Sequence, residues 1–226
     1  MRTHYDFAAD GQPARRLLVL LPPAKASLED LTEQGFVAAV RSRRLALDVV
    51  LADASPQRVL AQTAVRDLHR QVIAPAKARG YAEIWLAGIS LGGFNALDYA
   101  ASHAAELAGI KLIAPYPGTG DILNEIEAAG GAAAWASAPD CPLADERRWW
   151  HWLSQEAQRG ASGLPIWLGL SQQDRFRRGQ ALLAALLPAA RTRLIAGDHC
   201  WPAWRTLWQQ WLDEGPLAHP DAERTV

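Results

Sequence analysis

Residues 88–92 read Gly-Ile-Ser-Leu-Gly, so a serine has a glycine two positions before it and another two positions after it. A serine hydroxyl becomes a nucleophile toward a carbonyl carbon when a neighbouring base takes its proton. Ser90 follows a short apolar run at 84–87 and precedes a helix-like segment at 91–103. A serine on a sharp turn from strand to helix needs small flanking residues, because larger ones would collide. The pattern therefore indicates a nucleophilic serine at the start of a helix.

The start of that helix can also stabilise negative charge. Its free backbone N–H groups and partial positive charge would face an oxyanion formed by attack of the serine. Leu91 directly follows the serine, so we expect its N–H to be one donor. The second donor should come from the loop after the strand at 17–21, which begins Pro-Pro-Ala-Lys. Since proline has no N–H, Ala24 or Lys25 must donate, and we favour Ala24.

A serine nucleophile also needs a base, usually a histidine that a carboxylate orients. Asp174 follows a strand-like run at 165–170, and His199 follows another at 193–196. The carboxyl ends of parallel strands meet at one edge of a sheet, so these side chains should converge on Ser90. We therefore predict Ser90 as the nucleophile, His199 as the base and Asp174 as the acid that orients it.

Other residues are weaker candidates for the same roles. His151 lies in a tryptophan-rich segment and is an alternative base. Asp198 is an alternative acid, although neighbours on a turn rarely aim their side chains at one another, which disfavours a pair with His199. We interpret Cys200 as a packed thiol, because Ser90 already fills the place of the nucleophile.

The elements that must position these residues alternate between strand-like and helix-like patterns. This alternation is typical of an α/β fold, a mostly parallel sheet of about six strands with helices on both faces. The strands are expected near 17–21, 45–53, 83–87, 110–114, 165–170 and 193–196. Inserts at the carboxyl edge of such a sheet tend to lie over the ligand. We therefore interpret the strandless segment at 117–160 as a short cap.

Three side chains are predicted to contact the substrate. Trp150 lies in the expected cap helix at 145–158, where it would either line the pocket or belong to the core. Trp201 opens the last helix, directly after the motif around His199. Arg175 would either belong to a solvated charge cluster or favour anionic substrates at the mouth of the pocket.

Composition excludes several classes of function. The chain of 226 residues fits one domain, 1–226, with a frayed tail at 215–226. The 23 basic and 24 acidic residues give a net charge of −1, so we expect neither nucleic acid nor membrane as a partner. The beginning of the chain lacks a secretory pattern, which predicts a cytoplasmic protein. The two cysteines lack metal-ligand spacing, and we expect no metal and no cofactor.

Two motifs resemble those of the α/β-hydrolase superfamily, in particular small carboxylesterases and acyl hydrolases. They are Gly-Ile-Ser-Leu-Gly-Gly-Phe at 88–94 and Gly-Asp-His-Cys-Trp-Pro at 197–202. The likeness spans 17–212 and implies a minimal α/β-hydrolase fold, ester hydrolysis without a metal, and the Ser-His-Asp triad above. Many relatives carry His-Gly where this chain has prolines at 22–23, which leaves the second oxyanion donor open. The opening antiparallel strands of larger relatives shrink here to about residues 5–8.

The predicted function is hydrolysis of a small carboxylic ester or thioester by a serine hydrolase that forms an acyl-enzyme. One alternative keeps the fold and the triad but acts on an amide, a peptide or a carbon–carbon bond. Another is a non-catalytic binding protein of the same fold, which would ordinarily have lost a member of the triad. The sequence leaves the oligomeric state and the natural substrate open.

Overall fold

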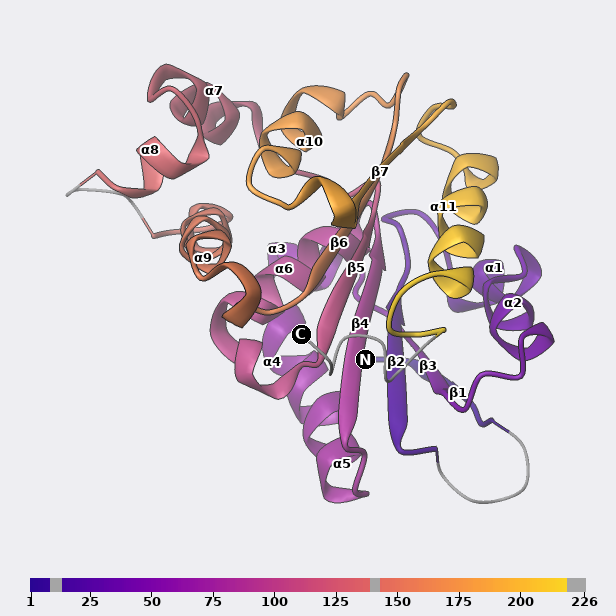
Figure 1. The fold of residues 1–226 in the computed structure, drawn as a ribbon. Coiled ribbons are helices and arrows are strands. Elements are labelled where there is room, and N and C mark those ends of the chain that lie inside the picture. Colours follow the sequence, from indigo (N-terminus) through magenta and orange to yellow (C-terminus); the bar gives the residue numbers. More distant parts are fainter. Residues whose placement is uncertain (9–13, 139–142, 219–226) are drawn as a thin grey trace.

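The computed structural model describes residues 1–8, 14–138 and 143–218, and these form a seven-stranded sheet (Figure 1). The strand order is β1-β3-β2-β4-β5-β6-β7. Strand β1 runs antiparallel to β3 and every other pair is parallel, which confirms the predicted mostly parallel sheet. The strands are β1 (Thr3–Asp6), β2 (Arg16–Leu21), β3 (Asp48–Ala52), β4 (Glu83–Ile89), β5 (Gly109–Ile113), β6 (Ile166–Ser171) and β7 (Thr192–Ile195).

The central strands are nearly continuous apolar runs because helices cover both of their faces. In β2, which reads Arg-Leu-Leu-Val-Leu-Leu, every residue is buried. One face of the sheet packs against α1 (Leu28–Glu33), α2 (Phe36–Ser42) and α11 (Trp201–Asp213). The other carries α3 (Pro56–Leu60), α4 (Ala64–Leu68), α5 (Ala74–Ala78), α6 (Leu91–His103), α9 (Arg147–Gln158) and α10 (Arg177–Ala184).

The remaining elements are short. A π-helical turn at His69–Ile73 joins α4 to α5, and α7 (Gly120–Ala128) and α8 (Ala132–Ala136) follow β5. Turns of 3₁₀ helix lie at Ala104–Glu106, Gly160–Ser162 and Ala189–Arg191.

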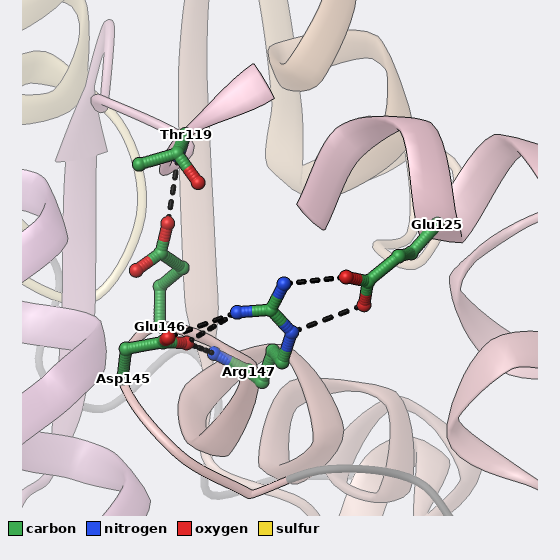
Figure 2. Close-up of polar contacts among 5 residues, drawn as sticks. All are labelled: Thr119, Glu125, Asp145, Glu146 and Arg147. Atoms are coloured by element: carbon green, nitrogen blue, oxygen red, sulfur yellow. Dashed lines mark hydrogen bonds and ion pairs between the residues drawn. The ribbon is translucent and has the colours of Figure 1, made fainter. Parts of the chain in front are cut away.

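The segment between β5 and β6 lies against α6 at one side of the sheet, where α9 packs on that helix. Figure 2 shows how its parts are joined. Arg147 at the start of α9 contacts Glu125 of α7 and Asp145, with 3.0 Å between Arg147 Nε and Glu125 Oε2. The backbone N–H of Thr119 donates to Glu146 Oε1 over 2.7 Å. These contacts fix α7 and the loop before it relative to α9.

Trp150 belongs to the core of this segment. Its side chain is fully buried, its ring stacks on Trp149 with centroids 4.9 Å apart, and its indole N–H donates to the Pro117 carbonyl over 2.9 Å. The prediction that Trp150 lines the substrate pocket is therefore wrong. Trp149 and Trp150 of α9 are both buried because their rings stack on each other and together pack into the apolar core.

The first residues of the predicted frayed tail pack against the rest of the protein. Leu217 is fully buried, and Arg16 donates through Nη1 to the carbonyls of Pro216 and Leu217. This part of the prediction is wrong because the chain folds back from α11 onto the start of β2. Residues 219–226 lie outside the described residues.

Candidate active site

Ser90 sits on the sharp turn that the sequence predicts. Strand β4 ends at Ile89 and α6 begins at Leu91, and the serine between them has φ 53° and ψ −113°. A positive φ is strained for a residue with a side chain and persists only where the surroundings hold it. Here Ser90 N–H donates to the Ile113 carbonyl, and the Ser90 carbonyl accepts from Tyr116 N–H, both over 2.9 Å. The end of β5 thus holds the turn.

The two flanking glycines leave no room for a side chain. A Cβ atom on Gly88 would lie 2.2 Å from the Gly92 carbonyl oxygen. A Cβ atom on Gly92 would lie 2.2 Å from the carbonyl oxygen of Leu21, at the end of β2. Both obstacles are backbone atoms, which cannot rotate away as a side chain can. The close packing of this turn explains why glycine stands two positions before and two positions after Ser90.

The structure brings Ser90, His199 and Asp174 into one line. His199 Nε2 lies 2.9 Å from Ser90 Oγ, and His199 Nδ1 lies 2.8 Å from Asp174 Oδ2. Ser90 follows β4, Asp174 follows β6 and His199 follows β7. The parallel sheet itself therefore sets the distances between the three residues. Neither alternative, His151 or Asp198, takes a place in this line. The arrangement can move a proton from the serine to the imidazole while the carboxylate orients the ring.

Asp174 is held as a carboxylate. Burial of its side chain acts to raise the pKa, but hydrogen bonds from His199 and from the Phe176 N–H, the latter 2.8 Å long, outweigh burial. The pKa of Asp174 therefore lies below its ordinary value. An ionised carboxylate keeps a proton on Nδ1 of His199 and leaves Nε2 free to accept the serine proton. The imidazole plane is fixed by perpendicular ring contacts with Phe176 and Trp204, with centroids 5.0 and 4.9 Å away.

The three candidate oxyanion donors are backbone N–H groups near Ser90 in the chain or along its pocket. In the described part of the chain, no hydrogen bond uses the N–H of Leu91, Ala24 or Lys25. The N–H of Ala26 donates to the Pro23 carbonyl over 3.1 Å, which folds this loop into a turn. Ala24 and Lys25 both line the pocket that contains Ser90, so each remains a candidate for the second donor.

The pocket at Ser90 has a volume of about 370 Å³. His199 and the loop after β2 form part of its wall, and the rest is formed by Asp30, Trp201, Trp204 and Arg175. Two of the predicted substrate contacts, Trp201 and Arg175, thus border the pocket. Trp204 was not predicted as a pocket residue, because its spacing in the last helix also fits the stripe that packs on the sheet.

The described part of the segment at 117–160 does not contribute to the lining of the pocket at Ser90, and residues 139–142 lie outside the described residues. The interpretation of this segment as a cap stays a prediction. Helix α9 of this segment packs on α6, because its buried tryptophans need the apolar surface of that helix. Part of the segment borders a neighbouring pocket, which also contains Arg175.

Neither a metal centre nor a membrane span is found in the parts of the chain that the structure describes. In those residues no group of three or more His, Cys, Asp or Glu side chains could hold a metal ion. No helix among them has the length and apolar character needed to cross a bilayer.

Comparison with solved structures places this architecture among known folds. No protein family model matches the chain, and no curated protein matches its sequence. A ferulic acid esterase superimposes with a TM-score of 0.60 at 15% identity, over 87% of this chain and 82% of that one. An S-formylglutathione hydrolase from Staphylococcus aureus gives 0.59 at 12% identity, over 87% and 79%. A carboxyl esterase from Bacillus coagulans gives 0.57 at 12%, over 93% and 91%. The chain therefore has the α/β-hydrolase fold.

Proposed function

We propose that this protein is a serine hydrolase that cleaves a small carboxylic ester or thioester through an acyl-enzyme. The observation that carries the proposal is the 2.9 Å contact between His199 Nε2 and Ser90 Oγ, on a strained turn that opens into a pocket. The structural neighbours add support, because they are esterases and serine hydrolases. A fold alone does not define a reaction, so the proposal depends on the site.

In the first half of the reaction Ser90 Oγ attacks the carbonyl carbon, and His199 Nε2 takes the hydroxyl proton. The carbonyl oxygen becomes an oxyanion that accepts hydrogen bonds from Leu91 N–H and from Ala24 or Lys25 N–H. Collapse of this intermediate breaks the bond to the alcohol or thiol, which leaves with the proton held by His199. Ser90 is then acylated.

The second half repeats these steps with water. His199 takes a proton from a water molecule, and the resulting nucleophile attacks the acyl carbon on Ser90. The same N–H groups bind the second oxyanion, and collapse returns the proton to Ser90 Oγ as the carboxylic acid leaves. Asp174 stays ionised throughout and stabilises the imidazolium that forms twice.

The pocket favours substrates of modest size. Its volume of about 370 Å³ lies near the lower end for small-molecule sites. Trp201 and Trp204 give one wall an apolar surface suited to a short acyl or alcohol group. The prediction of a cytoplasmic location stays a prediction.

Two alternatives use the same residues or the same fold. Amide, peptide or carbon–carbon bond cleavage would need the same triad, and a panel of matched esters and amides separates these reactions. A non-catalytic binding protein would show neither turnover nor a reactive serine. The alignment of Ser90, His199 and Asp174 favours catalysis, because a binding protein has no need of a serine in hydrogen-bond contact with an oriented imidazole.

The test is active-site labelling. A fluorophosphonate reacts with a serine only where a base activates it, so intact protein should gain one adduct, and peptide mapping should find it on Ser90. Hydrolysis of a series of 4-nitrophenyl esters should accompany the labelling. A protein that is folded, unlabelled and inactive on every ester would contradict the proposal.

A further inference from the structure

Arg175 lies between two pockets. It is exposed and borders the pocket of about 370 Å³ that contains Ser90. It also borders a second pocket of about 310 Å³, formed by the segment from Tyr116 to Leu123 and by the start of α10. A substrate whose ester group reaches Ser90 can therefore extend past the same guanidinium in either direction.

The charge of Arg175 is not neutralised within the described part of the chain. No ion pair or hydrogen bond there uses its guanidinium. Its neighbour in the second pocket, Arg178, is by contrast paired with Glu127 at 2.6 Å and bonded to Asn124. An exposed arginine without a partner on the protein can still offer both edges of its guanidinium to a ligand.

The guanidinium rests on a fixed aromatic platform. Its Cζ atom lies 4.8 Å from the centre of the Phe176 ring. That ring makes edge contacts with Tyr116, with centroids 5.2 Å apart, and with His199, with centroids 5.0 Å apart. Stacking on an aromatic ring reduces the freedom that an arginine loses when it binds an anion. The Phe176 ring thus contacts both the Arg175 guanidinium and the His199 imidazole.

The other charges at the pocket add to this preference. Lys25 borders the pocket at Ser90, and within the described residues no hydrogen bond or ion pair uses its ammonium, which therefore adds positive charge to the pocket. Asp30 also borders the pocket, but its carboxylate is engaged at the start of α1, where Oδ2 accepts from the N–H and the hydroxyl of Ser27. An anion that enters the pocket thus meets two cations and one carboxylate that is already bonded.

From this arrangement we infer that Arg175 binds a carboxylate of the substrate, and that the preferred substrates are esters or thioesters bearing a second, ionised acid group. The inference rests on the proposed function and names the substrate class of the same site. A carboxylate can meet the guanidinium through two parallel hydrogen bonds, which aligns the substrate as well as attracting it. Because Arg175 borders both pockets, the acid group can belong to the acyl part or to the alcohol part.

The test compares two matched pairs of esters. In one pair the charge is on the acyl part, 4-nitrophenyl hydrogen glutarate against 4-nitrophenyl pentanoate. In the other it is on the alcohol part, 4-acetoxybenzoate against 4-methylphenyl acetate. The quantity measured is the ratio of kcat/KM for the charged ester to that for its neutral match. Intrinsic reactivity cancels when this ratio is compared between variants.

Arg175→Ala should lower the ratio about tenfold or more in at least one pair, and the pair affected shows which part of the substrate carries the acid. Arg175→Lys should lower it less, since it keeps the charge but loses the bidentate geometry. Arg205→Ala is the matched control, because it removes the same charge from an exposed position of α11 outside both pockets. This control should leave both ratios within about twofold of the wild type.

Several outcomes would overturn the inference. An unchanged ratio in both pairs would show that Arg175 does not read the charge. An equally large fall of the ratio in Arg205→Ala would show that only the overall charge of the protein matters. A fall of the ratio in Lys25→Ala but not in Arg175→Ala would assign the carboxylate contact to Lys25. These results differ from failure of the proposed function, in which the wild-type protein neither reacts with a fluorophosphonate nor hydrolyses the neutral esters.

A binding measurement gives a second readout that does not depend on turnover. Ser90→Ala protein should bind 4-nitrophenyl hydrogen glutarate or 4-acetoxybenzoate more tightly than the neutral match in calorimetry. Adding Arg175→Ala to Ser90→Ala should remove this difference, whereas adding Arg205→Ala should keep it. Equal affinity of Ser90→Ala protein for charged and neutral esters in both pairs would contradict a carboxylate contact.

Discussion

His199 Nε2 lies within hydrogen-bond distance of Ser90 Oγ, at 2.9 Å, although 109 positions separate the two residues in the chain. The contact exists because β4 and β7 end at the same edge of a parallel sheet, with β5 and β6 between them. Ser90 and His199 each lie in the first turn after their strand. Strand β6 lies between β4 and β7, and Asp174 in the loop after β6 contacts His199. The backbone of the sheet therefore sets the geometry of the proposed reaction.

Removal of the Ser90 hydroxyl should abolish the chemistry and spare the fold. Ser90→Ala should lower ester kcat by about 10⁶, the loss seen when the nucleophile of a comparable triad is removed. It should also eliminate fluorophosphonate labelling. Circular dichroism and the thermal midpoint serve as the control for folding. Persistent labelling of the folded Ser90→Ala protein would move the nucleophile to another residue.

The proposed orienting role of Asp174 separates it from its near neighbour Asp198. Asp174→Asn should lower kcat by about 10⁴, because an amide favours the wrong tautomer of His199. Asp198→Asn is the matched control, since the same change is made one residue from the base, and its effect should be within about tenfold. Both rates are measured on one neutral 4-nitrophenyl ester. A larger loss in Asp198→Asn would reverse the assignment.

The lowered pKa of Asp174 also predicts how stability depends on pH. The folded-state pKa lies below the unfolded value of about 3.9, so ionisation of this carboxyl favours the folded state. Its contribution is fully present above about pH 4 and is lost as the pH falls through the folded pKa. The slope of unfolding free energy against pH in this acid range should be shallower in Asp174→Asn than in the wild type. Urea titrations between pH 2.5 and 7 measure both slopes, and identical slopes would contradict the shift.

The turn at Ser90 should tolerate no Cβ atom at Gly92. Gly92→Ala would press a methyl group to 2.2 Å from the Leu21 carbonyl oxygen, so β2 or the turn must move. We expect a loss of about 1–3 kcal/mol in the free energy of unfolding, together with a large loss of ester turnover. Gly120→Ala is the control, because a Cβ atom there meets nothing within 4 Å. Urea denaturation of the two variants checks this, and equal stability of both would contradict the packing argument.

Trp150 should matter for stability and not for substrate choice. Trp150→Ala removes a fully buried ring and should cost about 3–5 kcal/mol in the free energy of unfolding. Trp150→Phe keeps most of the packing but loses the hydrogen bond to Pro117, and should cost less. The chain-length preference of folded Trp150→Phe protein on 4-nitrophenyl esters should match the wild type. A shift toward longer chains would restore Trp150 as a pocket residue.

Much of the fold and the core of the site could be predicted because the signals are local. Strand β4, the glycines around Ser90 and the start of α6 are contiguous, and parallel strands bring their carboxyl ends together whatever the loops contain. The positions of Trp150 and Trp204 could not be predicted in the same way. A tryptophan on a helix has the same spacing whether it faces a pocket or the core, and only packing against other elements decides between them.

The sequence by itself determined the order of the elements, the strained turn at Ser90 and the three side chains that meet there, because each follows from short-range pattern and strand direction. Only the tertiary structure decided what surrounds them. It buried Trp150 beside Trp149, packed α9 on α6, and set Arg175 between two pockets on the ring of Phe176. The physical reason is that burial and charge pairing depend on neighbours far away in the chain, which local pattern does not specify.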